Sequence, residues 1–142
     1  MSLLHKLRFA SLLGSCRASF VKGDASRTLQ LLHEAEQIRP LPPVYQVFKS
    51  MALTRSGCRD EGAQLLRRVV QLTSSSTDNE SKYALTYAQL LEALASENFE
   101  LAEVLFDRAK GITVKASVRR ALPLLIKPSV EWLRSEPSVG VR

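Results

Sequence analysis

The sequence predicts an all-α fold in which helical hairpins stack side by side. Three observations support this fold class. Apolar residues recur at helical spacing, as in residues 60–72, where Leu65, Leu66 and Val69 share one face and Arg67 and Arg68 another. Residues 9–40 form a complete helix–turn–helix unit, and this unit then recurs along the chain.

The first unit places two amphipathic helices on either side of a short turn. Gly23 can adopt the left-handed conformation that ends the helix at residues 9–22, and Asp24 can cap the next helix. Pro40 ends the second helix because proline lacks the backbone N–H needed to continue it.

The repeat has three copies, and the third follows at a longer offset than the second. Gly23 and Gly57 mark the turn in the first two copies. The additional residues before the third copy fall in the polar loop 73–78. Three buried positions follow these offsets: Leu32, Leu66 and Phe106; Ala35, Val69 and Ala109; Ile38, Leu72 and Ile112.

The remaining helices are predicted in order from local signals. The proline-rich segment 39–43 is a rigid linker with Pro43 in the first turn of a helix at 44–56. A helix at 60–72 follows, with Leu72 on its inward face. Asp78 or Asn79 caps a helix at about 80–95, and Asn98 caps one that ends near residues 110–111.

The C-terminal part departs from the repeat, because a fourth copy would place Pro123 inside a helix. We expect a short helix at 115–122, with Val130, Trp132 and Leu133 covering the end of the last hairpin. The predicted single domain spans residues 1–135, with hairpins at about 9–40, 43–73 and 80–113, a cap at 115–135 and a flexible tail at 136–142.

These residues resemble the tetratricopeptide repeat family, whose unit is an antiparallel helix pair of about 34 residues. The resemblance covers residues 9–114 and is carried by Gly23, Leu32, Ala35, Ile38 and Pro40 in the first copy and by Asn98, Phe99, Ala102, Phe106 and Ala109 in the third. The offset from Gly23 to Gly57 equals the length of this unit. The second copy departs from the family, with Gly62 at the small-residue position and no proline after Leu72. The resemblance implies a right-handed solenoid of three helix pairs with a helical C-terminal cap.

Composition fits one domain able to bury a core. The chain has 142 residues, of which 45% are hydrophobic and 24% charged. Cys16 and Cys58 are too few for a disulfide framework, so we expect reduced thiols, with Cys16 in the core. No apolar run reaches the roughly 18 residues of a membrane span.

Two locations fit the N-terminal composition. Residues 1–23 are basic and contain no acid, which is typical of mitochondrial targeting segments. The same residues supply the first helix of the first hairpin, which favours an uncleaved structural helix in a cytoplasmic protein. Under the mitochondrial alternative, cleavage occurs before Phe9 or not at all.

The sequence contains no arrangement of residues typical of an enzyme. His5 and His33 lie in different predicted helices, the cysteines form no C-x-x-C pair, and the six glycines are scattered. We therefore expect no catalytic residue, no metal site and no cofactor.

The tetratricopeptide resemblance implies a concave groove, lined by the first helix of each hairpin, that binds a peptide segment of another protein. The residues at these positions are mainly apolar, and some must pack between hairpins. The lysines and asparagines of members that grip a C-terminal carboxylate are missing, since Leu13, Arg17, Phe48, Ala84 and Ala88 hold those positions. The predicted groove comprises Leu13, Arg17, Phe20, Val47, Phe48, Met51, Arg55, Tyr87, Leu91 and Leu94.

An apolar groove with two arginines suits an amphipathic helix or an extended hydrophobic segment with acidic flanks. The expected function is that of a scaffold subunit or dedicated chaperone. The alternative is an RNA-associated subunit of a mitochondrial ribonucleoprotein, since the net charge is +6 and the pI about 9.7. Its candidate phosphate contacts are Arg67, Arg68, Arg119, Arg120 and Lys127.

Overall fold

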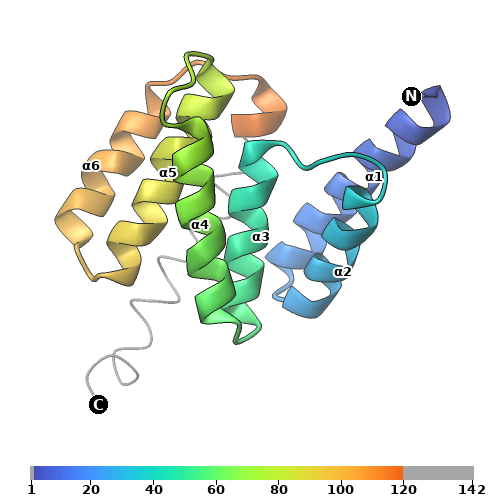
Figure 1. Cartoon of the computed structure of the whole chain (residues 1–142), viewed down its shortest axis with the longest axis horizontal. Coiled ribbons are helices and arrows are strands. Elements are labelled where there is room, and N and C mark those ends of the chain that lie inside the picture. The colour runs from blue at the N-terminus through green and yellow to red at the C-terminus, as the bar shows by residue number, and fades with distance from the viewer. Residues whose placement is uncertain (1, 120–142) are drawn as a thin grey trace.

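The computed structural model describes residues 2–119, and every regular element in this range is a helix (Figure 1). The all-α prediction is therefore confirmed. Residues 116–119 are also helical, at the end of the described range. The six complete helices are α1 (Leu3–Val21), α2 (Ala25–Glu36), α3 (Pro43–Arg55), α4 (Arg59–Thr73), α5 (Asn79–Ala95) and α6 (Phe99–Lys110).

Each helix packs against the next one in the chain, and α3 also contacts α5. Figure 1 shows α3 and α4 in the middle, with α1 and α2 on one side and α5 and α6 on the other. A single hydrophobic cluster includes residues from all six helices. The helix pairs therefore share one core.

Helix α1 begins at Leu3, well before the predicted start at Phe9. The Ser2 side chain caps it by accepting a hydrogen bond of 3.2 Å from the backbone N–H of His5. Residues 2–8 are exposed, and Phe9 is the first buried residue. The predicted start therefore coincides with the packed part of α1, and the exposed residues 3–8 extend the helix beyond it.

Aromatic side chains join α1 to α3 within the core. Phe20 and Phe48 are 1% and 0% exposed, and their rings meet edge to face with centroids 5.0 Å apart. Tyr45 stacks on Phe48 at 5.6 Å. In α5, the Tyr83 and Tyr87 rings are 4.9 Å apart and both are buried. The Phe20–Phe48 contact therefore links the first helix pair to the second, whereas the two tyrosines pack within the third pair.

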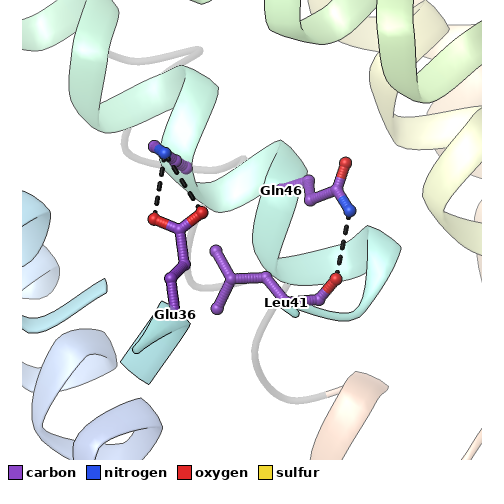
Figure 2. A network of polar contacts seen from close by, with 4 residues as sticks. Glu36, Leu41 and Gln46 are labelled. Atoms are coloured by element: carbon purple, nitrogen blue, oxygen red, sulfur yellow. Dashed lines mark hydrogen bonds and ion pairs between the residues drawn. The ribbon is translucent and has the colours of Figure 1, made fainter. Parts of the chain in front are cut away.

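Polar contacts fix the connection between α2 and α3 (Figure 2). The Lys49 ammonium lies 3.0 Å from the Glu36 carboxylate, which joins the two helices. The Gln46 amide donates a 3.0 Å hydrogen bond to the Leu41 carbonyl in the linker. Together with Pro42 and Pro43, these contacts set the direction in which α3 leaves α2.

The same turn ends α1, α3 and α5. In each turn, a residue with positive φ (Gly23 at 85°, Gly57 at 98°, Glu97 at 59°) follows the helix. The next residue donates its backbone N–H to a carbonyl five positions earlier: Asp24 to Ser19 (3.0 Å), Cys58 to Leu53 (2.8 Å) and Asn98 to Ala93 (2.8 Å). This is the Schellman arrangement.

The predictions for the first and third turns are confirmed in part. Gly23 is left-handed, and the Asp24 and Asn98 side chains cap α2 and α6. Glu97 was not predicted to be left-handed, since glutamate seldom adopts this conformation. The repeat spacing nevertheless indicates this position, because Glu97 follows Gly57 at the same offset that relates Phe106 to Leu66.

Helices α3 and α4 approach closely at Gly62, which is buried. A Cβ atom at this position would lie 2.6 Å from the Thr54 hydroxyl and 2.8 Å from the Ser50 carbonyl oxygen. Glycine is therefore required by packing, although it weakens an isolated helix.

The prediction that Leu72 faces inward is wrong, because Leu72 is 61% exposed. The buried positions of α4 include Leu66, Val69 and Thr73, which are spaced as one helical stripe, and Leu72 lies outside it. The repeat offset pairs Leu72 with Ile38, but α2 ends at Glu36 whereas α4 continues to Thr73. Aligned positions therefore have different backbone conformations.

The predicted core thiol is confirmed. Cys16 is 0% exposed, and burial raises the pKa of its thiol to about 12. Cys58 is half-buried at the N-cap of α4, and both thiols are free.

The described part of the predicted cap packs on the end of the last helix pair. The Arg119 guanidinium donates hydrogen bonds to the carbonyls of Lys110 (3.1 Å) and Ile112, and it lies 5.7 Å from the centre of the Tyr83 ring. Val114 and Val118 are half-buried against the core. The predicted contacts of Val130, Trp132 and Leu133 lie outside the described residues.

The positive φ angles of Gly57 and Glu97 predict opposite effects of two substitutions on stability. Gly57→Ala should lower the free energy of unfolding by about 1 kcal/mol, because alanine is strained at positive φ. No atom would crowd the added Cβ, so this effect comes from the backbone alone. Glu97→Gly should raise the free energy of unfolding by roughly 0.5–1 kcal/mol, because it removes the same strain. Urea denaturation followed by circular dichroism measures both free energies of unfolding. A change of the same sign in the two variants would contradict the left-handed conformation described for these turns.

Gly62 and Gly14 form a second matched pair. Gly62→Ala should destabilise the protein by roughly 1 kcal/mol or more, because overpacking between α3 and α4 outweighs the gain in helix propensity. Gly14→Ala in α1 should stabilise it, since the added Cβ would make only an ordinary contact, 3.8 Å from the Arg17 side chain. The same denaturation measurement applies, and a stabilising Gly62→Ala would show that α3 and α4 can separate without cost.

Candidate functional site

A cleft of about 390 Å³ lies between α3, α4 and α5. Its apolar lining comes from all three helices, with Met51 on α3, Leu66 on α4, and Leu91 and Leu94 on α5. The complete lining comprises Ser50, Met51, Thr54, Arg55, Arg59, Asp60, Ala63, Leu66, Leu91, Leu94 and Ala95.

Four of the ten predicted groove residues line this cleft: Met51, Arg55, Leu91 and Leu94. Met51 and Leu94 are 4% and 3% exposed, so little of either side chain is accessible. Leu91 is half-buried, and Ala63 and Ala95 are exposed. The accessible lining therefore combines small and medium-sized apolar side chains.

Arg55 supplies a half-buried positive charge within this lining. Its guanidinium carbon lies 4.3 Å from the centre of the Phe20 ring, a cation–π contact that fixes the side chain. Burial lowers the pKa of Arg55 from its usual value, although a guanidinium stays charged at neutral pH. The Lys49–Glu36 and Lys110–Asp107 ion pairs of the described residues do not involve Arg55.

Arg59 and Asp60 add opposite charges at the start of α4, and both are exposed. Their formal charges sum to zero, and both side chains are open to solvent. Arg55 is therefore the cleft cation that is half-buried and that takes part in neither of these ion pairs of the described chain.

The second predicted groove arginine has a structural partner. The Arg17 guanidinium donates a 2.5 Å hydrogen bond to the Tyr45 hydroxyl, joining α1 to α3. Burial raises the pKa of Tyr45, and the Arg17 contact opposes that rise. Arg17 does not line the cleft.

The other five predicted groove residues lie in the core. The exposed fraction of each side chain is 8% or less, and none of the five lines the cleft. Phe20 packs on Phe48, and Tyr87 packs on Tyr83 and Phe106, so the protein's own side chains fill this part of the predicted groove. These residues are Leu13, Phe20, Val47, Phe48 and Tyr87.

The predicted groove lay on the first helix of each pair, so the contribution of α4 was missed. Arg59, Asp60, Ala63 and Leu66 form that wall. Leu66 was recognised as an inward-facing residue. Its place beside an open cleft depends on how far α5 lies from α4, which no local pattern encodes.

The basic candidates for phosphate contacts do not form one described patch. Arg67 and Arg68 are exposed on α4. Arg119 is half-buried and its guanidinium is held by two backbone carbonyls. Arg120 and Lys127 lie outside the described residues.

Neither a metal site nor a membrane span is found in the described chain. Residues 2–119 contain no group of three or more His, Cys, Asp or Glu side chains arranged to hold a metal ion. No helix in this range is long and apolar enough to cross a membrane.

Comparisons with known proteins do not identify this site independently. The functional assignment therefore depends on the cleft, and the tetratricopeptide resemblance stays a prediction. No protein-family model, no curated protein and no solved structure matches the chain.

Proposed function

We propose that this protein is a non-catalytic protein-interaction module, acting as a scaffold subunit of a larger complex or as a dedicated chaperone. The observation that carries the proposal is the cleft between α3, α4 and α5, with its apolar lining and the Arg55 cation. Clefts of this size and character accept apolar side chains of a partner, while a polar group sets orientation.

We infer that the three helix pairs are repeats of one unit stacked as a right-handed solenoid, in the manner of tetratricopeptide proteins. The recurring turn at Gly23, Gly57 and Glu97 supports this inference, because its hydrogen bonds repeat at the same offsets as the sequence. The packing of each helix against the next also supports it. A repeat architecture typically presents binding surfaces along its helices.

The partner segment that suits the cleft has an apolar face and an acidic residue beside it. The accessible apolar lining at Ala63, Leu91 and Ala95 favours leucine-like side chains, and the half-buried Arg55 favours a carboxylate. An amphipathic helix or an extended segment can present both groups. Since Arg17 is hydrogen-bonded to Tyr45, Arg55 is the arginine assigned to this contact.

The RNA-associated alternative depends on exposed basic residues. Arg67 and Arg68 lie on the solvent face of α4, and the net charge of +6 favours acidic partners. The structural role of Arg119 weakens this alternative, because its guanidinium is engaged by carbonyls of the chain. The two functions predict opposite responses to nuclease and salt.

Filling the cleft should abolish partner binding without unfolding the protein. Ala95→Trp places a large side chain in the lining from an exposed position, and Ala18→Trp on the exposed face of α1 is the matched control. Arg55→Gln should weaken binding at least tenfold by leaving the partner's carboxylate unpaired. The measurement is quantitative affinity purification from the native cell, with circular dichroism of each variant as the control for folding.

Under the proposed function, partners survive nuclease and raised salt, are lost with Ala95→Trp, and are retained with Ala18→Trp. Two outcomes would favour the RNA alternative over the cleft. One is loss of the partners on nuclease treatment. The other is loss of the partners in the Arg67→Gln/Arg68→Gln variant while the Ala95→Trp variant still binds them.

A further inference from the structure

The first two turns of α1 project beyond the rest of the protein, and Figure 1 shows this end of α1 extending past α2. Three leucines in this segment are unusually exposed: Leu3 at 72%, Leu4 at 76% and Leu7 at 59%. The packed part of α1 begins at Phe9, whose ring is covered by the Arg39 guanidinium at 5.1 Å. The segment 3–8, called here the α1 overhang, therefore adds nothing to the core.

The leucines of the α1 overhang share one side of the helix. At about 100° per residue, Leu3, Leu7 and Leu4 span an arc of roughly 100°. Lys6 and Arg8 fall on the two sides of this arc, and His5 lies opposite it. The result is an apolar stripe with a cation along each edge.

The charged side chains of α1 all have one sign. Residues 1–23 contain no acid, and Lys6 and Arg8 are both exposed. The ion pairs of the described chain lie elsewhere, in Lys49–Glu36 and Lys110–Asp107. A surface that covers the leucines therefore also meets Lys6 and Arg8, and negative charge on that surface favours the contact.

We propose that the α1 overhang binds the surface of an anionic phospholipid bilayer and holds the protein peripherally on it. Leucine side chains enter the boundary between headgroups and acyl chains, while lysine and arginine at the edges contact lipid phosphates. This inference goes beyond the interaction module proposed above and does not depend on it.

The size and shape of the α1 overhang favour a lipid surface over a protein partner. A stable protein interface uses roughly 20–30 residues on each side, whereas residues 3–8 of α1 supply only a small part of that number. A bilayer is a continuous fluid surface that can accept the leucine side of the segment without a matching groove. Few apolar residues and two cations give weak, reversible binding that depends on anionic lipid and on salt.

The test is flotation of the full chain with vesicles of phosphatidylcholine alone or with about one third phosphatidylglycerol. We expect the protein to float with the anionic vesicles only, and less so at raised salt. Leu3→Gln/Leu4→Gln/Leu7→Gln should abolish flotation. Lys6→Gln/Arg8→Gln should weaken it roughly 30-fold, which corresponds to about 1 kcal/mol per cation.

Two control variants separate this site from general effects. Arg67→Gln/Arg68→Gln removes the same charge from α4, and Leu72→Gln/Leu101→Gln removes exposed leucines elsewhere; both should float like the wild type. Every variant residue is exposed, and circular dichroism checks that each variant is folded. Equal binding to neutral vesicles, no binding to either kind, or equal loss in the α4 variant would overturn the proposal.

Discussion

The rest of the structure depends on helix α3, because α3 contacts four of the other five complete helices. It contacts α2, α4 and α5, and it meets α1 through the Phe20–Phe48 rings and the Arg17–Tyr45 hydrogen bond. Val47 and Phe48 are 0% exposed, so they lie fully inside these contacts. A helix pair cannot bury its apolar faces alone, so the pairs on either side depend on α3.

The same packing determines where the cleft lies. Aromatic side chains pack between α1 and α3, whereas the cleft between α3, α4 and α5 has no aromatic residue in its described lining. Arg55 belongs to both regions, since it lies over the Phe20 ring and also lines the cleft. The position of its charge is therefore set by the core, which gives the cleft a fixed point for an anionic group.

The two proposed surfaces use different parts of the fold and different physics. The cleft is a largely apolar site whose lining is held by the core. The α1 overhang is a projecting helix end whose leucines are accessible to its surroundings. A protein with both surfaces would hold a partner segment near a membrane surface.

The sequence by itself determined the helices, their order, the Gly23 turn, the caps at Asp24 and Asn98 and the buried thiol of Cys16, because these follow from local signals. It also contained the offset that leads to Glu97. Tertiary structure alone decided that Gly62 is required by its neighbour α3, that Leu72 faces solvent, and that Phe48 is core while Leu91 borders a cleft. Helical periodicity identifies an apolar face, but which part of that face meets another helix depends on distances between segments far apart in the chain. The helical architecture was therefore readable from the sequence, and the site only in part.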